Sequence, residues 1–137
     1  MKIKLDKGAF LPVREHETDA GMDIRALKGV RIPAKSNMVV HTGIHIQLPP
    51  KTCGLLVAKS GLNVKNSILT TGLIDEGYTG EIVVNVYNHG DNSYMIMAGD
   101  KITQLVILPC YYEQIEIVDS LEENTDRGSN GFGSTGR

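Results

Sequence analysis

Residues 72–81, near the middle of the chain, combine side chains that could do chemistry with a backbone suited to a turn. The sequence GLIDEGYTGE places one carboxylate, Asp75, three residues before one aromatic ring, Tyr78. A positioned carboxylate can accept a proton from a water molecule, and glycines let a backbone approach a ligand closely. Two interpretations stay open for this segment alone. It is either a small pocket with one charge and an aromatic wall, or an ordinary hairpin turn, where Asp and Gly are common.

The elements that must position this segment read as β-strands. Apolar runs bounded by turn residues recur along residues 1–118 at intervals of about 8 to 12 residues, which is typical of an all-β sandwich or barrel. The clearest is residues 37–48, where Ile44, Ile46 and Leu48 alternate with polar neighbours. A single short helix, at most two turns long, is expected over residues 62–67. The other predicted strands cover residues 2–5, 23–27, 29–33, 53–58, 68–71, 82–88, 93–97, 102–108 and 111–118.

Residues 119–137 differ in composition from this domain, because they turn polar and then glycine-rich. Such a composition predicts a flexible C-terminal arm. A guanidinium, two hydroxyl side chains and accessible backbone N–H groups could clamp a phosphate, and the single Phe could stack on a ring. A disordered tail without a binding role is the alternative.

Composition limits the classes of partner. The length of 137 residues predicts one domain, and 41% hydrophobic residues with few aromatics make Ile, Val and Leu the core residues.

The net charge of the chain, −2, offers no general attraction to nucleic acid or to an anionic membrane. No apolar run approaches the roughly 20 residues that span a bilayer, and the start lacks a signal-peptide pattern. We expect no nucleic-acid or membrane partner and a cytoplasmic location, in the host cytoplasm if the protein is viral.

Metal and disulfide patterns are weak. Cys53 and Cys110 are far apart and form no C-x-x-C motif, so they predict neither a zinc site nor a disulfide framework, although one bridge between them stays open. His41 and His45 would share one face of a strand, but at about 3.3 Å per residue they lie about 13 Å apart. That separation is too large for both to bind one ion.

Five segments, read together, resemble the motifs of the trimeric dUTPase family, the deoxyuridine triphosphate nucleotidohydrolases. In chain order they are AGMDIRA (20–26), KSGL (59–62), GLIDEGYTG (72–80), GDKITQLV (99–106) and RGSNGFGSTG (127–136). Their order, their spacing and nearly the whole chain length fit the family. The resemblance implies a β-barrel, jelly-roll-like subunit with a flexible arm, assembled as a homotrimer with each active site built at subunit boundaries.

The resemblance also implies the reaction, hydrolysis of dUTP to dUMP and pyrophosphate, which limits uracil incorporation into DNA and supplies dUMP for thymidylate synthesis. Asp75 would be the general base that takes a proton from the water attacking the α-phosphorus. Asp23 would hold a water on a Mg²⁺ cofactor rather than the ion itself. The ion and cationic side chains would offset the charge of three phosphates.

The family likeness assigns substrate contacts as well. Main-chain atoms of Gly72 and Val83 would pair with the uracil edge and leave no room for a 5-methyl group. Tyr78 would pack on the deoxyribose and exclude a 2′-hydroxyl. Phosphate contacts would come from Lys59, Ser60, Gly61 and Gln104, and the contacts of the arm from Arg127, Phe132, Gly133, Ser134 and Thr135. In the arm, Phe132 would stack on uracil while its neighbours clamp the γ-phosphate and close the site against water.

Two positions depart from the family pattern. Lys59 stands where Arg is normal, and an ammonium meets a phosphate as a point charge without the bidentate fork of a guanidinium. Leu69 stands where several members carry Asn, which removes one side-chain contact to the base.

Three other functions are alternatives to a dUTPase. A dCTP deaminase shares the fold and the nucleotide class, but it attacks the base and needs no carboxylate at position 75. A catalytically weak nucleotide-binding or regulatory protein could use the same trimer, and an all-β viral or structural trimer could lack chemistry altogether. The joint presence of Asp75, Tyr78, Gln104 and the glycine-rich arm favours the enzyme, because a scaffold needs no such combination.

Overall fold

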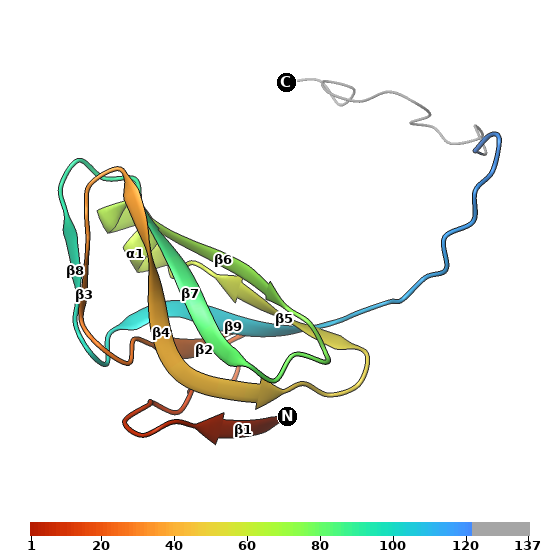
Figure 1. The fold of residues 1–137 in the computed structure, drawn as a ribbon, viewed down its shortest axis with the longest axis horizontal. Helices are drawn as coiled ribbons and strands as arrows, with labels where there is room; N and C mark the ends of the chain where they lie inside the picture. Colours follow the sequence, from red (N-terminus) through yellow and green to blue (C-terminus); the bar gives the residue numbers. More distant parts are fainter. Residues whose placement is uncertain (122–137) are drawn as a thin grey trace.

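The computed structural model describes residues 1–121 and confirms a mostly β architecture (Figure 1). Within this part of the chain one helix, α1, lies between β5 and β6, where the sequence predicted it over residues 62–67. The elements in order are β1 (Lys2–Leu5), β2 (Met22–Arg25), β3 (Val30–Ile32), β4 (Ser36–Gln47), β5 (Thr52–Val57), α1 (Ser60–Asn66), β6 (Ile68–Ile74), β7 (Glu81–Asn88), β8 (Tyr94–Ile96) and β9 (Lys101–Pro109).

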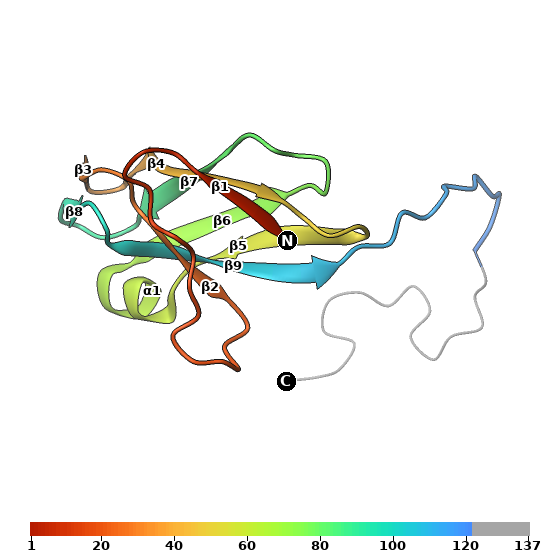
Figure 2. The ribbon, with the colours of Figure 1, turned by 90° about the horizontal axis from the view of Figure 1, so that it is seen from below.

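Seven of these strands form one antiparallel sheet in the order β1-β4-β7-β6-β5-β9-β2, and β3 pairs with β8 in a second, two-stranded sheet. The large sheet curls around the core, and the β3–β8 pair lies at the end of the body where β4 begins (Figures 1 and 2). No helix in residues 1–121 is long and apolar enough to cross a membrane.

The core is aliphatic, as the composition predicted. Ile44, Ile46 and Leu48 are buried while Gln47 is exposed, so the alternation read from the sequence is the alternation of the two faces of the strand. The same inward face continues across the sheet, with fully buried members such as Ile24 on β2. This packing gives the site-bearing strands a rigid support.

A bulge in β4 fixes the position of β7. The register between these strands shifts between His41 and His45, and Gly43 has a φ of +65°. The backbone N–H groups of Thr42 and Gly43 donate to the carboxylate of Glu81 at 3.1 and 2.8 Å. Because a bulge leaves backbone donors without a partner strand, Glu81 satisfies them and holds the start of β7 against β4.

The strand predicted over residues 111–118 is wrong. These residues form no strand, and the side chains of Ile115 and Ile117 are 95% and 96% exposed. After β9 the chain runs away from the body (Figure 1). Strand β9 already pairs with β5 on one side and β2 on the other, so the segment that follows meets no free sheet edge within its own chain.

Candidate active site

The hairpin of β6 and β7 is open at its turn. These strands pair with each other only from Ile68 to Thr70. Beyond Thr70, β6 pairs with β5 through Ile74, whereas β7 pairs with β4. The two strands therefore diverge toward the turn, and the backbone groups that face each other across the wedge are left without a ladder partner. Such groups are free to pair with a ligand.

The wedge between the strands forms a pocket of about 220 Å³. Four residues singled out from the sequence line it together: Gly72, Asp75, Tyr78 and Val83. The pocket interpretation of residues 72–81 is therefore the one that the geometry favours. Its remaining lining residues are Leu56, Leu73, Ile74, Glu81 and Ile82.

The turn that carries Asp75 is shaped by the ring of Tyr78. The Tyr78 backbone N–H donates to the Asp75 carbonyl at 3.1 Å, and the Tyr78 hydroxyl donates to the Glu81 carbonyl at 2.8 Å. A Cβ on Gly80 would overlap the Tyr78 ring, so this glycine is needed for space. The turn thus holds Asp75 and Tyr78 in the lining of the same pocket.

A second pocket, of about 310 Å³, lies where β2 meets β9. Asp23 on β2 pairs with Gln104 on β9, and Lys59 reaches the same pocket from the residue before α1. Three predicted residues are thereby brought together. The others that line this pocket are Glu15, His16, Asp19, Ala20, Gly21 and Lys101.

Asp23 is a buried carboxylate, 6% exposed, held by two ammonium groups. Lys59 pairs with one of its oxygens, and Lys101 pairs with the other at 2.8 Å. Burial by itself raises the pKa of Asp23, but the hydrogen bonds from Lys101 and Lys59 outweigh it and hold this pKa below the usual range. Hydrogen bonds to Asp23 and to Glu15 raise the pKa of Lys101 in turn.

Sequence reasoning missed Lys101. It stands in the fourth family-like segment, GDKITQLV, but the sequence does not show that β9 lies beside β2, which is what brings Lys101 to Asp23.

Ser60 and Gly61 begin α1, are exposed, and line neither pocket. The five predicted residues of the arm, Arg127, Phe132, Gly133, Ser134 and Thr135, lie outside the described residues.

The two pockets are separate within one chain. They share no lining residue, and strands β5 and β9 lie between the strands that carry Asp75 and Asp23. Crossing from β6 to β2 takes three inter-strand steps, or about 14 Å at the usual spacing of strands. One chain therefore does not bring Asp75 and Asp23 to the same reacting atom.

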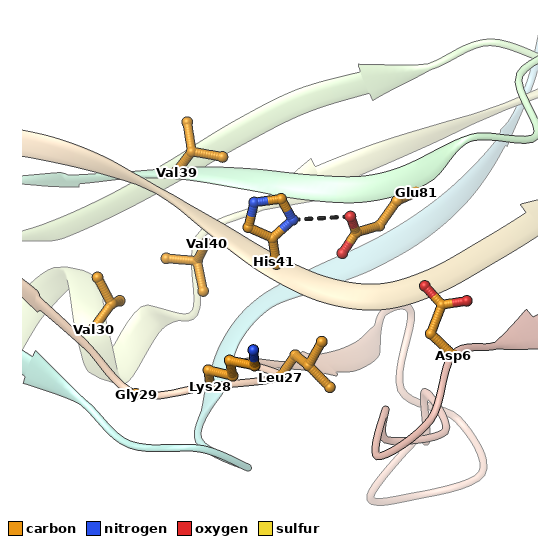
Figure 3. Close-up of a pocket in the computed structure, with 9 residues that line it drawn as sticks. All are labelled: Asp6, Leu27, Lys28, Gly29, Val30, Val39, Val40, His41 and Glu81. Atoms are coloured by element: carbon orange, nitrogen blue, oxygen red, sulfur yellow. Dashed lines mark hydrogen bonds and ion pairs between the residues drawn. The ribbon is translucent and has the colours of Figure 1, made fainter.

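A larger hollow of about 470 Å³ contains none of the predicted residues (Figure 3). In it, His41 lies beside Glu81 with a contact of 2.9 Å, and apolar side chains such as Leu27 and Val40 form the wall. The ring of His41 contacts Glu81, whereas the ring of His45 contacts Asp6.

Comparison with known proteins gives the class of this fold and site. A family model described as dUTPase matches residues 8–136. The "Deoxyuridine 5'-triphosphate nucleotidohydrolase" of Gloeothece citriformis is 46% identical, covering 97% of this chain and 93% of the relative. The protein of the same name from Saccharomyces cerevisiae is 42% identical, covering 99% of this chain and 94% of the relative.

Solved structures agree. The dUTPase of Staphylococcus bacteriophage 80alpha, solved with dUPNHPP, matches with a TM-score of 0.93 and 32% identity, covering 99% of this chain and 98% of that one. A mutant dUTPase from phage phi11 of S. aureus, described with a structural Mg(II) ion, matches with a TM-score of 0.81 and 28% identity, covering 87% and 96% of the two chains. The likeness in fold and in sequence extends over nearly the whole chain. The chain belongs to the dUTPase family.

The lysine pairs of Asp23 predict a pH-dependent stability. Because the pKa of Asp23 is lowered by folding, its stabilising contribution is complete above the usual carboxyl value of 3.8 and is lost as the pH falls through the folded-state pKa. Asp23→Asn should lower the free energy of unfolding at pH 7 by about 1 to 3 kcal/mol and flatten the acid side of the stability curve. Urea unfolding between pH 2.5 and pH 7 measures both effects.

Asp91→Asn is the matched control. Asp91 also pairs with a lysine, Lys35, at 2.8 Å, but its side chain is 88% exposed, whereas Asp23 is buried. Exposed ion pairs contribute little, so this variant should follow the wild-type curve. If the free energy of unfolding of Asp23→Asn falls with decreasing pH as steeply as that of the wild type, Asp23 is not the source of the acid sensitivity.

Proposed function

We propose that the protein hydrolyses dUTP to dUMP and pyrophosphate. The observation that carries this proposal is the open β6–β7 hairpin, which places Asp75, Tyr78 and unpaired strand backbone around one pocket. The full-length likeness to proteins named deoxyuridine 5'-triphosphate nucleotidohydrolase supports it.

Asp75 is proposed as the general base. It is exposed at the end of β6, and none of the hydrogen bonds or ion pairs found among residues 1–121 uses its carboxylate. It is therefore free to accept a proton from a bound water. As that proton moves to the carboxylate, the water oxygen bonds to the α-phosphorus, and the bond from this phosphorus to the bridging oxygen breaks to release pyrophosphate.

Base and sugar selection are proposed for the rest of the same pocket. Gly72 pairs with Leu56 on one side only, and its other side faces the wedge toward Val83. Main-chain groups placed there can pair with the uracil edge, while the narrowness of the wedge excludes a 5-methyl group. Tyr78 would lie against the deoxyribose, where a 2′-hydroxyl would meet its ring.

The triphosphate is proposed to bind at the Asp23 pocket through Lys59, Gln104 and the start of α1. Lys59 is already paired with Asp23, so a phosphate oxygen must compete with that carboxylate or share the ammonium group with it. Lys101 can keep Asp23 neutralised while Lys59 turns to the substrate. The arm, from Arg127 to Thr135, is proposed to cover the bound nucleotide.

Mg²⁺ is proposed to arrive with the substrate. Among residues 1–121 there is no group of three or more His, Cys, Asp or Glu side chains that could hold a metal ion. The ion would therefore be ligated by phosphate oxygens and water, and Asp23 would accept a hydrogen bond from one of those waters. The bound ion would supply charge neutralisation on the phosphates.

A homotrimer with shared sites is proposed because the two pockets lie apart in one chain. The Asp75 pocket of one subunit and the Asp23 pocket of the next would together accommodate base, sugar and phosphates. In a symmetric trimer every Asp75 pocket would lie against an Asp23 pocket of a neighbouring subunit, and the fold of the subunit would not need to change.

Nucleotide selectivity tests the function. Purified protein with Mg²⁺ should release pyrophosphate from dUTP, and release from dTTP and UTP should be at least about 100-fold slower, since a bulky group that does not fit must displace packed atoms. Equal rates with the three nucleotides, or no release from dUTP, would refute the proposal.

The Asp75→Asn variant tests the general base. It keeps the shape of the side chain but removes its proton-accepting charge, so turnover should fall about 10² to 10⁴-fold while nucleotide binding persists. Turnover is measured by pyrophosphate release, and binding by calorimetry with dUPNHPP. Asp91→Asn, which alters an exposed carboxylate outside both pockets, is the control and should have wild-type turnover. Wild-type turnover in Asp75→Asn would exclude Asp75 as the base.

A further inference from the structure

Glu76, the residue after Asp75, does not line the base pocket, and its carboxylate points to a different set of partners. One of its oxygens accepts two hydrogen bonds. The backbone N–H of Lys51 donates at 2.9 Å, and the hydroxyl of Tyr112 donates at 2.5 Å. Lys51 belongs to the turn before β5, and Tyr112 belongs to the segment that follows β9.

These bonds tie three segments together at one point. The turn of Asp75 is attached to the turn before β5, and both are attached to the start of the C-terminal segment. A third bond closes the group, because the Cys110 backbone N–H donates to the Lys51 carbonyl at 2.8 Å. We call Lys51, Glu76, Cys110 and Tyr112 the turn anchor.

The anchor is the last attachment of the described C-terminal segment. From residue 113 to residue 121 no hydrogen bond or ion pair to the body is found, and Ile115 and Ile117 are almost fully exposed. Tyr112 is therefore the side chain through which the segment leading to the arm is connected to the turn that carries Asp75.

The protonation states suit this bond. The hydrogen bond from Tyr112, together with that from the Lys51 N–H, lowers the pKa of Glu76, and the same contact with Glu76 raises the pKa of Tyr112 to about 12. At neutral pH the pair is a carboxylate accepting from a protonated phenol, a charge-assisted bond stronger than a neutral one.

We propose that Glu76 is a positioning residue for Asp75, and that Tyr112 acts through it to link the C-terminal segment to the catalytic turn. This inference rests on the proposed role of Asp75. Because the two residues are adjacent in one turn, release of the Glu76 side chain lets the Asp75 carboxylate move relative to the pocket. Displacements of about 1 Å at a catalytic group can reduce rates by up to about 100-fold.

The test separates kcat from KM for dUTP. Glu76→Ala removes both bonds and should lower kcat by about ten-fold or more, while KM changes by less than about two-fold, because base, sugar and phosphate contacts come from other residues. Glu76→Gln keeps an acceptor oxygen for Lys51 and Tyr112 and should recover most of kcat. A change confined to KM, or no rescue by Gln, would overturn the inference.

Tyr112→Phe is the sharper variant, because it removes one oxygen from an exposed ring and leaves folding unaffected. It should lower kcat by about three-fold or more, and it should have no further effect in Glu76→Ala, since both changes remove the same bond. Tyr111→Phe is the matched control, a neighbouring ring that is 82% exposed and has no hydrogen bond through its hydroxyl among the described residues. Its kcat should equal that of the wild type.

The outcomes keep this inference apart from the proposed function. If the wild type does not hydrolyse dUTP, or if Asp75→Asn is fully active, the proposed function fails. If the wild type is active, Asp75→Asn is inactive, and Tyr112→Phe has the same kcat as Tyr111→Phe, only the positioning role of the anchor fails.

Discussion

The site depends on a competition between strand pairings. Beyond Thr70, β6 pairs with β5 and β7 pairs with β4, so the two strands of the hairpin do not pair with each other. The Glu81 carboxylate reinforces the separation by binding the N–H groups of the β4 bulge. The cost of unpaired backbone is tolerated where a ligand can supply the missing hydrogen bonds. The unpaired edge that we propose for base recognition is therefore a consequence of the sheet topology.

The burial of Asp23 is a second constraint, and it determines where two lysine side chains lie. A carboxylate that is 6% exposed requires compensation, and Lys59 and Lys101 provide it. The same pocket is lined by two more carboxylates, Glu15 and Asp19, so a phosphate bound there would have to compete with carboxylates for the two ammonium groups. This pocket and the Asp75 pocket lie on opposite sides of β5 and β9, so one chain does not place Asp23 and Asp75 side by side. Assembly is thus part of the chemistry that we propose.

Local sequence patterns predicted most of the strands and helix α1, because alternation and turn residues act over short distances. The expectation that Gly72 and Val83 share a pocket with Asp75 and Tyr78 came from the family resemblance, and these four residues do line one pocket. Contacts between distant strands left no such pattern. The pairing of Lys101 with Asp23 and the bond between Glu76 and Tyr112 follow from strand order, which the sequence does not display. The strand predicted over residues 111–118 failed for the same reason, since an apolar alternation does not say whether a partner edge exists.

Subunit complementation tests the central claim most directly, that Asp75 of one subunit works with Asp23 of another. Asp75→Asn and Asp23→Asn proteins are unfolded, mixed in equal amounts and refolded together, and dUTP hydrolysis is compared with that of each variant refolded alone. Random assembly should combine an intact Asp75 with an intact Asp23 in about a quarter of the sites and restore about that fraction of wild-type activity. A mixture no more active than the separate variants would contradict a site shared between subunits.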